Sequence, residues 1–222
     1  MGSLKGKKNF FSPSMVIYIL SITSGGMDVV SFLKFHFVFT SAMTGNIALL
    51  GLSIGGGELL LSTHSLSALL GFFLGVYIGS IYFWRKSTAS FLLFCEAIIL
   101  ASYSVIWLCY GLHINGFIVY ILIILSSVSM GLQSVAARLI NIAGIPSVVF
   151  TNTITSIIIK AYECMKEGSS YSGELPRQLV ALLSYTAGAI TFSWLIYSML
   201  SVAVVLPALI IMVASVMMRN IS

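Results

Sequence analysis

Apolar residues run in long stretches along this chain, separated by short polar segments. Eight stretches are visible, at about residues 14–33, 36–55, 65–84, 90–112, 116–138, 142–162, 178–197 and 202–219. A helix needs about 20 apolar residues to cross the hydrocarbon core of a bilayer. Continuous runs of Leu, Ile, Val and Phe are typical of helices, whereas outer-membrane barrels show shorter, alternating segments. The pattern therefore predicts an all-α membrane protein.

The second and sixth stretches differ from the others because hydroxyl and amide side chains interrupt them. The second contains FTSAMT at residues 39–44, and the sixth contains FTNTIT at residues 150–155, 111 residues later. Gly45 in the second stretch, and Gly144 with Pro146 in the sixth, weaken a continuous helix. Each stretch is therefore predicted to be a break followed by a short apolar helix.

These breaks belong to a longer internal repeat. Gly26-Met27-Asp28 aligns with Gly131-Leu132-Gln133, and LLGFFLG from Leu69 aligns with LLSYTAG from Leu182. Each half, about 14–112 and 116–219, then has one span, one broken segment and two further spans. Because three crossings is an odd number, the second half is predicted to be inverted. Inverted repeats with discontinuous helices recur in channels and secondary transporters.

The composition fits a membrane location. Only 8% of the 222 residues are charged, against about 25% in a soluble domain, so we expect the lipid bilayer to cover the surface. Polar loops are at most about 15 residues long, which leaves no room for a nucleotide-binding domain. We expect a single membrane domain over residues 1–222 with no cofactor.

The basic residues distinguish two topologies. Cytoplasmic loops carry an excess of Lys and Arg. If all eight stretches cross, seven of the eleven basic residues are cytoplasmic, whereas ten are if the second and sixth stretches enter and return on one side. The second model predicts six spanning helices plus two re-entrant or half-crossing segments, with both termini cytoplasmic in a bacterial inner membrane. Full crossing stays an alternative. Because the basic residues lie singly at boundaries, the net charge of +5 does not indicate nucleic-acid binding.

The two breaks are predicted to meet inside the protein, because irregular backbone in a membrane needs protein or water around it. We expect both short helices to point their N-terminal ends at this centre, which suits a polar or anionic solute. Thr44 is expected to cap the first short helix, and Thr153 or Thr155 the second. The predicted solute-binding residues are Thr40, Ser41, Thr44, Asn46, Thr151, Asn152, Thr153 and Gln133.

Two carboxyl groups lie inside apolar stretches, where a charge costs about 2.5–3.5 kcal/mol. Asp28, twelve residues before Thr40, is the predicted site of proton coupling; cation binding and hydrogen bonding to the broken backbone are the alternatives. Glu96 lies less than two turns after Ser90. We therefore expect Glu96 to reach the cytoplasmic interface and to have a structural role.

Other motifs are interpreted as structural. Residues 51–55, GLSIG, match the nucleophile-elbow pattern but end an apolar half-helix rather than a strand, so no enzyme activity is expected. The histidines at 36, 64 and 113 lack metal-ligand spacing and are expected to be exposed, and no metal is expected. Gly71, Gly75 and Gly79 form a ladder that permits close helix packing within the chain or in a homodimer.

Four motifs together resemble a known family. GGMDVVSF from Gly25, FVFTSAMTGN from Phe37, MGLQSVAAR from Met130 and VVFTNTITS from Val148 are similar to the YoaK family of uncharacterised bacterial membrane proteins. The resemblance covers about residues 14–215 and implies a membrane location and a compact helical fold, without a substrate. The family usually has Thr-Gly-Thr at residues 151–153, where this chain has Asn152, and Leu-Gln-Asn-Ala at residues 132–135, where it has Leu-Gln-Ser-Val.

The sequence thus predicts a small secondary transporter or channel-like permease for a small polar or anionic solute. The alternative is a membrane-embedded structural or regulatory protein, in which the breaks serve packing or partner docking.

Overall fold

The computed structural model describes residues 12–84, 88–111, 116–140, 150–167 and 173–221. These ranges are helical and contain no strand. Their helices are α1 (Pro13–Lys34), α2 (Met43–Gly56), α3 (Leu59–Trp84), α4 (Ala89–Tyr110), α5 (Phe117–Ile140), α6 (Phe150–Glu167), α7 (Glu174–Ser198) and α8 (Leu200–Ile221).

Six of these helices, α1, α3, α4, α5, α7 and α8, are long and apolar enough to cross a membrane. By contrast, α2 has only 14 residues, and the 18 residues of α6 include Lys160, Glu163 and Lys166. The predicted all-α membrane fold with six spanning helices is confirmed. The largest difference is that α3 begins at Leu59 rather than near residue 65, because the chain reverses at Gly57, whose φ of 75° suits glycine.

The chain doubles back between α1 and α2. α1 ends at Lys34, and α2 begins only at Met43. Between them, His36 and Phe37 adopt positive φ angles of 55° and 65°, which turn the chain. The predicted break in the second stretch therefore exists. In the sixth stretch, residues 142–149 lie outside the described part of the chain, and α6 is helical from Phe150.

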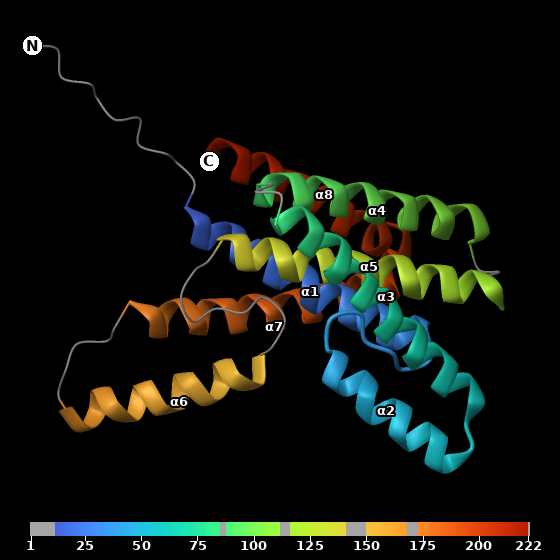
Figure 1. The fold of residues 1–222 in the computed structure, drawn as a ribbon, viewed down its shortest axis with the longest axis horizontal. Coiled ribbons are helices and arrows are strands. Elements are labelled where there is room, and N and C mark those ends of the chain that lie inside the picture. Colours follow the sequence, from blue (N-terminus) through green and yellow to red (C-terminus); the bar gives the residue numbers. More distant parts are fainter. Residues whose placement is uncertain (1–11, 85–87, 112–115, 141–149, 168–172, 222) are drawn as a thin grey trace, which may run out of the picture.

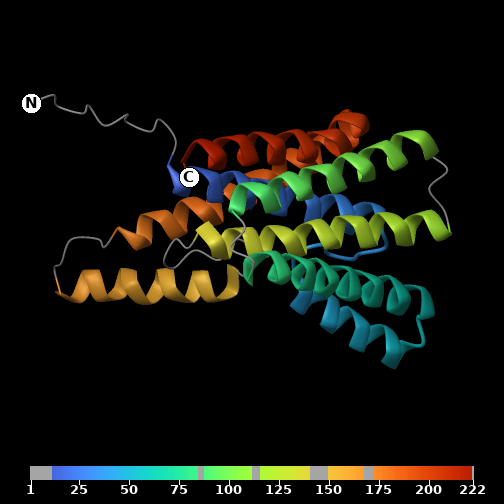
Figure 2. The same cartoon turned by 45° about the horizontal axis from the view of Figure 1, so that its top comes forward.

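The helices pack in pairs that repeat between the two halves (Figures 1 and 2). α1 packs along α7, and α3 packs along α5. α4 and α8 pack on each other, and in addition α4 packs on α5 and α1 packs on α8. The short helices lie at the edge of this group, α2 against α3 and α6 against α7. Exchanging the first four helices with the last four maps these contacts onto one another, which supports the repeat.

Glycines bring two of these pairs into close contact. A side chain on Gly188 would collide with the carbonyl of Ile22 across the α1–α7 pair, and one on Gly75 would collide with the carbonyl of Val128 across the α3–α5 pair. The glycine ladder therefore packs inside the chain, against α5. The homodimer stays a prediction, but the glycine ladder no longer supports it, because the ladder is already covered by α5.

Each helix of the first half runs in the opposite direction to its counterpart in the second half. In Figure 1, α1 and α4 run from left to right, and α5 and α8 from right to left, so the start of α1 and the end of α8 lie at one end. Arg138 and Arg219, in the last turns of α5 and α8, lie at this end, whereas Lys34 ends α1 at the other. These directions are those that an inverted repeat requires, but inversion across a bilayer stays a prediction.

Candidate functional site at the first helix break

Asp28 holds the first break in place. Its Oδ1 accepts hydrogen bonds from the backbone N–H groups of Thr40 (2.9 Å) and Ser41 (2.7 Å) and from the Thr40 hydroxyl (3.2 Å). Its Oδ2 accepts from the Ser41 hydroxyl (2.6 Å) and from the Tyr185 hydroxyl of α7 (2.8 Å). Because Asp28 lies six residues before the end of α1, the chain must return by roughly 9 Å to reach it.

Asn46 closes the same loop from the other side. Its Oδ1 accepts from the Phe39 N–H (2.9 Å), and its Nδ2 donates to the Phe39 carbonyl (2.6 Å). The amide thus pairs with one peptide group as a neighbouring strand would. Ser31 adds a third tie, donating from its hydroxyl to the Val38 carbonyl at 2.8 Å. These bonds satisfy the irregular backbone that a membrane interior would otherwise penalise.

The start of α2 differs from the prediction. Ala42, not Thr44, is the N-cap, and no side chain caps the helix. Thr44 lies in the first turn and is exposed. The prediction that Thr44 caps the helix is wrong, because Asp28 and Asn46 set the loop so that the helix starts at Met43. The first turn of α2 therefore lacks a side-chain cap for its N–H groups.

The second-half residues are distributed differently. α6 already includes positions 153 and 155, so the prediction that Thr153 or Thr155 caps it is also wrong. Asn152 is exposed and Thr153 is buried, and the side chain of Thr151 lies outside what the structure describes. Gln133, the counterpart of Asp28, donates to the Leu20 carbonyl (3.0 Å) and to the Ser24 hydroxyl (2.7 Å) of α1.

The two short helices begin toward the middle of the molecule. Figures 1 and 2 both show α2 and α6 starting near one another and running outward in opposite directions. Among the described residues, no hydrogen bond joins these two helices. Whether their ends enclose one solute site stays a prediction. Thr40, Ser41 and Asn46 already use their side chains within the protein. Of the predicted residues whose side chains the structure describes, Thr44 and Asn152 are the exposed ones.

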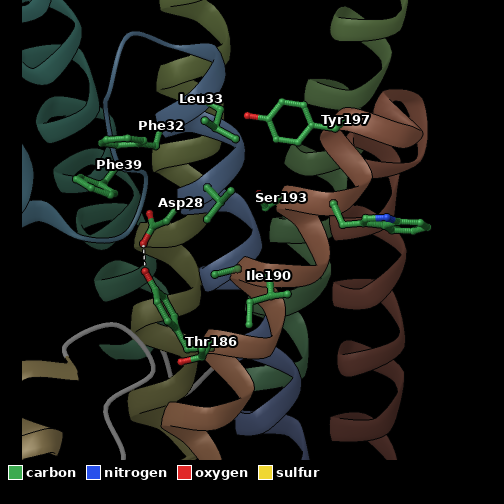
Figure 3. Close-up of a pocket in the computed structure, with 12 residues that line it drawn as sticks. Asp28, Phe32, Leu33, Phe39, Thr186, Ile190, Ser193 and Tyr197 are labelled. Carbon is green, nitrogen blue, oxygen red and sulfur yellow. Dashed lines mark hydrogen bonds between the residues drawn. The ribbon is translucent and has the colours of Figure 1, made fainter.

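A groove of about 700 Å³ opens between α1 and α7 beside the break. Asp28 and Tyr185 are among its polar lining residues, and its walls are largely apolar (Figure 3). Leu33 and Phe39 line it from the first half, and Ile190 and Trp194 from α7. Ile190 and Trp194 are 66% and 62% exposed, so in a bilayer this groove would open toward lipid.

Glu96 does not reach the interface. Its exposed fraction is 0%, and neither carboxyl oxygen has a hydrogen-bond partner among the described residues. The prediction of an interfacial Glu96 is wrong because α5 and α8 pack over the face of α4 that carries it. This buried group had no signal in the sequence beyond its place in an apolar stretch.

Ser53 and His64, which the sequence analysis also singled out, both contact other side chains of the protein. Ser53, the central residue of the elbow-like motif, lies inside α2; its hydroxyl donates to the Leu50 carbonyl and accepts from Ser62 of α3 at 2.8 Å. His64 is only 2% exposed, contrary to prediction, because its ring packs between His36 and Tyr120. The described residues contain no group of three or more potential metal ligands.

Comparisons with known proteins agree with a membrane location. A family model described as "Protein of unknown function (DUF1275)" matches residues 16–217, nearly the whole chain. The chain belongs to the DUF1275 family. A relative, the "UPF0700 transmembrane protein YoaK" of Bacillus subtilis (strain 168), is 35% identical over 184 residues, covering 79% of this chain and 80% of that protein. No solved structure matches the chain.

This membership confirms the resemblance seen in the motifs around Asp28 and Gln133. Together with the six apolar helices it establishes that this DUF1275 protein is a multi-pass membrane protein.

Proposed function

We propose that this protein is a small secondary transporter or channel-like permease for a small polar or anionic solute. The observation that carries the proposal is the break itself, which returns from the end of α1 and is held by Asp28 through five hydrogen bonds. Such a return places irregular backbone at the depth of a spanning helix, where it is found beside cavities and transport pathways.

The chemistry at the helix ends favours the solute class. The start of α2 has no side-chain cap and an exposed hydroxyl on Thr44. The N–H groups of Met43 and Gly45 donate to the carbonyls of Ser41 and Ala42, whereas the Thr44 N–H has no hydrogen-bond partner among the described residues. A helix N-terminus carries a partial positive charge and favours anions. We infer that Thr44 and the backbone of α2, together with Asn152 of α6, contact the solute. Thr40, Ser41 and Asn46 hold the loop that presents them.

We further propose that the protein lies in a bacterial inner membrane with both termini in the cytoplasm. Arg138 and Arg219, in the last turns of α5 and α8, lie at the end of the bundle where α1 starts, which agrees with the preference for basic cytoplasmic loops. A cysteine at Gly57, between α2 and α3, should react with a membrane-impermeant thiol reagent added outside. Protection of this cysteine in intact cells would contradict the orientation.

The transport site is tested by cysteine labelling in a chain whose Cys95, Cys109 and Cys164 have been replaced. Thr44→Cys and Asn152→Cys should react with small polar thiol reagents, because a solute path is wet. The control is Ile47→Cys, which is 56% exposed on the same face of α2 but one turn farther from the break. It should face lipid without reacting, because the proposed path passes the start of α2. If Thr44→Cys and Asn152→Cys are as inert as Ile47→Cys, the breaks serve packing, and the alternative of a structural or regulatory protein gains support.

The activity is tested in proteoliposomes with radiolabelled phosphate, uracil and alanine, representing small anions, nucleobases and amino acids. Because the chain has no nucleotide-binding motif, we expect a solute or ion gradient to supply the energy. Uptake should exceed that of protein-free liposomes for at least one probe. The absence of flux across such a panel would count against transport.

A further inference from the structure

The strongest feature outside the break is the buried carboxyl group of Glu96. The buried face of α4 is a single stripe that includes Leu93, Glu96 and Leu100. Glu96 lies in the middle of this stripe with an exposed fraction of 0%. Neither of its carboxyl oxygens has a hydrogen-bond partner among the described residues.

Hydrogen bonds between α4 and α8 enclose this stretch from both ends. The hydroxyls of Ser90 and Ser215 each donate to the other residue's carbonyl, at 2.9 and 2.8 Å. Farther along, the Ser104 hydroxyl donates to the Val204 carbonyl at 2.8 Å. Glu96 lies between these ties, so the two antiparallel helices separate it from water on this side.

Positive charges are distant from Glu96. The titratable and charged side chains on the helices that pack against α4 are Tyr120 and Arg138 of α5 and Arg219 of α8. Since Ser215 lies beside Ser90, Arg219 is roughly 15 Å from Glu96 along the axis. Arg138 is about 10 Å away by the same reckoning along the α4–α5 hairpin. Both guanidinium groups are exposed at the end of the bundle.

The surroundings therefore favour the neutral carboxylic acid. A buried carboxylate without donors or a cation is costly, and such groups take up a proton instead. The contrast with Asp28 is direct: five donors converge on Asp28, as a carboxylate requires, whereas Glu96 has none among the described residues. Of the two carboxyls, only Glu96 suits a group that must be neutral while enclosed.

We propose that Glu96, rather than Asp28, binds the proton that is coupled to transport. This rests on the proposed function. α4 belongs to the first repeat, and α5 and α8, which cover Glu96, belong to the second. Movement of α4 relative to these helices would admit water to Glu96. With α4 open to one side of the membrane, the acid would release one proton to water on that side. The carboxylate would then have to take up one proton from the opposite side before α4 encloses it again, so that one proton crosses the membrane in each cycle.

The proton itself is tested by infrared difference spectroscopy of the full chain in liposomes during a pH titration. At pH 7 the wild type should show the carbonyl stretch of a protonated carboxyl group. Glu96→Gln should lose this band, and Asp28→Asn should keep it. Glu96→Leu provides a second variant without a buried polar group, in case the glutamine perturbs folding, and should lose the band as well. A band that survives both Glu96 substitutions, or no band in the wild type, would overturn the proposal.

Coupling is tested with phosphate, uracil or alanine, whichever the wild type transports. An imposed pH gradient should drive accumulation by the wild type and not by Glu96→Gln, whereas exchange of internal for external solute should continue in the variant. Gradient-driven accumulation by Glu96→Gln equal to that of the wild type would contradict the role of Glu96. If the wild type transports none of the probes, the proposed function fails and the coupling role with it, while the infrared band still reports whether Glu96 holds a proton.

Discussion

Asp28 and Glu96 are both buried carboxyl groups on long helices of the first half, yet their surroundings are opposite. Asp28 lies at the α1–α7 contact, and five hydrogen-bond donors from the break and α7 point at its oxygens. Glu96 lies where α4 packs on α5 and α8, and its oxygens meet no donor among the described residues. The same chemical group therefore fastens the backbone in one region and favours a bound proton in the other.

The difference shows that burial alone does not assign a role to a membrane carboxyl. Asp28 has donors because the chain reverses after α1 and brings two free N–H groups back to it. Glu96 lacks them because regular helices, whose N–H groups are already paired, surround it. The following predictions test this contrast, from the largest expected effect to the smallest.

Replacing Asp28 should have the largest effect. Asp28→Leu leaves the N–H groups of Thr40 and Ser41 buried without acceptors, and we expect it to lower the free energy of unfolding by about 3–5 kcal/mol. Asp28→Asn, which keeps the shape and one acceptor oxygen, should lose less. Titration with SDS in mixed micelles measures both. A value for Asp28→Leu within error of the wild type would remove the distinction between the two carboxyls.

The glycine at the α1–α7 crossing should follow. A Cβ on Gly188 would collide with the Ile22 carbonyl, so Gly188→Ala must push α7 away from α1 and weaken the bond from Tyr185 to Asp28. We expect a loss of about 1–3 kcal/mol in the same titration. The matched control is Gly55→Ala in α2, where nothing lies within 4 Å; it should be neutral or stabilising, since alanine favours helix more than glycine. Equal effects of the two substitutions would contradict the close crossing.

Asn46 tests whether the loop needs a second clamp besides Asp28. Asn46→Ala removes both hydrogen bonds to the Phe39 peptide and should cost about 1–3 kcal/mol, because a half-buried N–H and a half-buried carbonyl lose their partners. Thr44→Ala, two residues away and exposed, should change the stability by less than about 0.5 kcal/mol. A neutral Asn46→Ala would mean that Asp28 alone holds the break.

Replacing Glu96 should have the smallest effect, with the opposite sign. Glu96→Leu removes a buried group without hydrogen-bond partners among the described residues and keeps a side chain of similar size. We expect no loss of stability, or a gain of about 1 kcal/mol. The free energy of unfolding is measured by the same SDS titration as for Asp28→Leu, so that the same substitution is compared at two buried carboxyl groups. A loss as large as that of Asp28→Leu would reveal a partner for Glu96 and contradict its assignment as a proton site.

The packing of the helices also limits which of them can move during transport. Most long-helix contacts join one half to the other, as α1 does with α7 and α3 with α5. Rocking of one complete repeat against the other would therefore have to open several close interfaces at once, including the crossings at Gly75 and Gly188. We expect smaller shifts, of the short helices or of α4, to accompany transport.

The spanning helices and the first break were predictable from local pattern. Runs of about 20 apolar residues indicate membrane helices whatever lies beside them, and the hydroxyl-rich segment before Met43 marked the place where α2 departs from α1. The repeat and the basic residues indicated the same organisation. The precise start of α2 was not predictable, because it depends on the bonds that Asp28 and Asn46 make across the loop.

By itself, the sequence determined the all-α membrane class, six spanning helices, the position of the first break and the residues available to fill it. Tertiary structure alone decided what those residues do. Thr40, Ser41 and Asn46 form hydrogen bonds that hold the loop, and Thr44 is exposed. Asp28 is surrounded by hydrogen-bond donors, whereas Glu96 has none among the described residues. The reason is physical: the length and apolarity of a helix are local properties, whereas the state of a buried polar group depends on which donors distant segments bring to it.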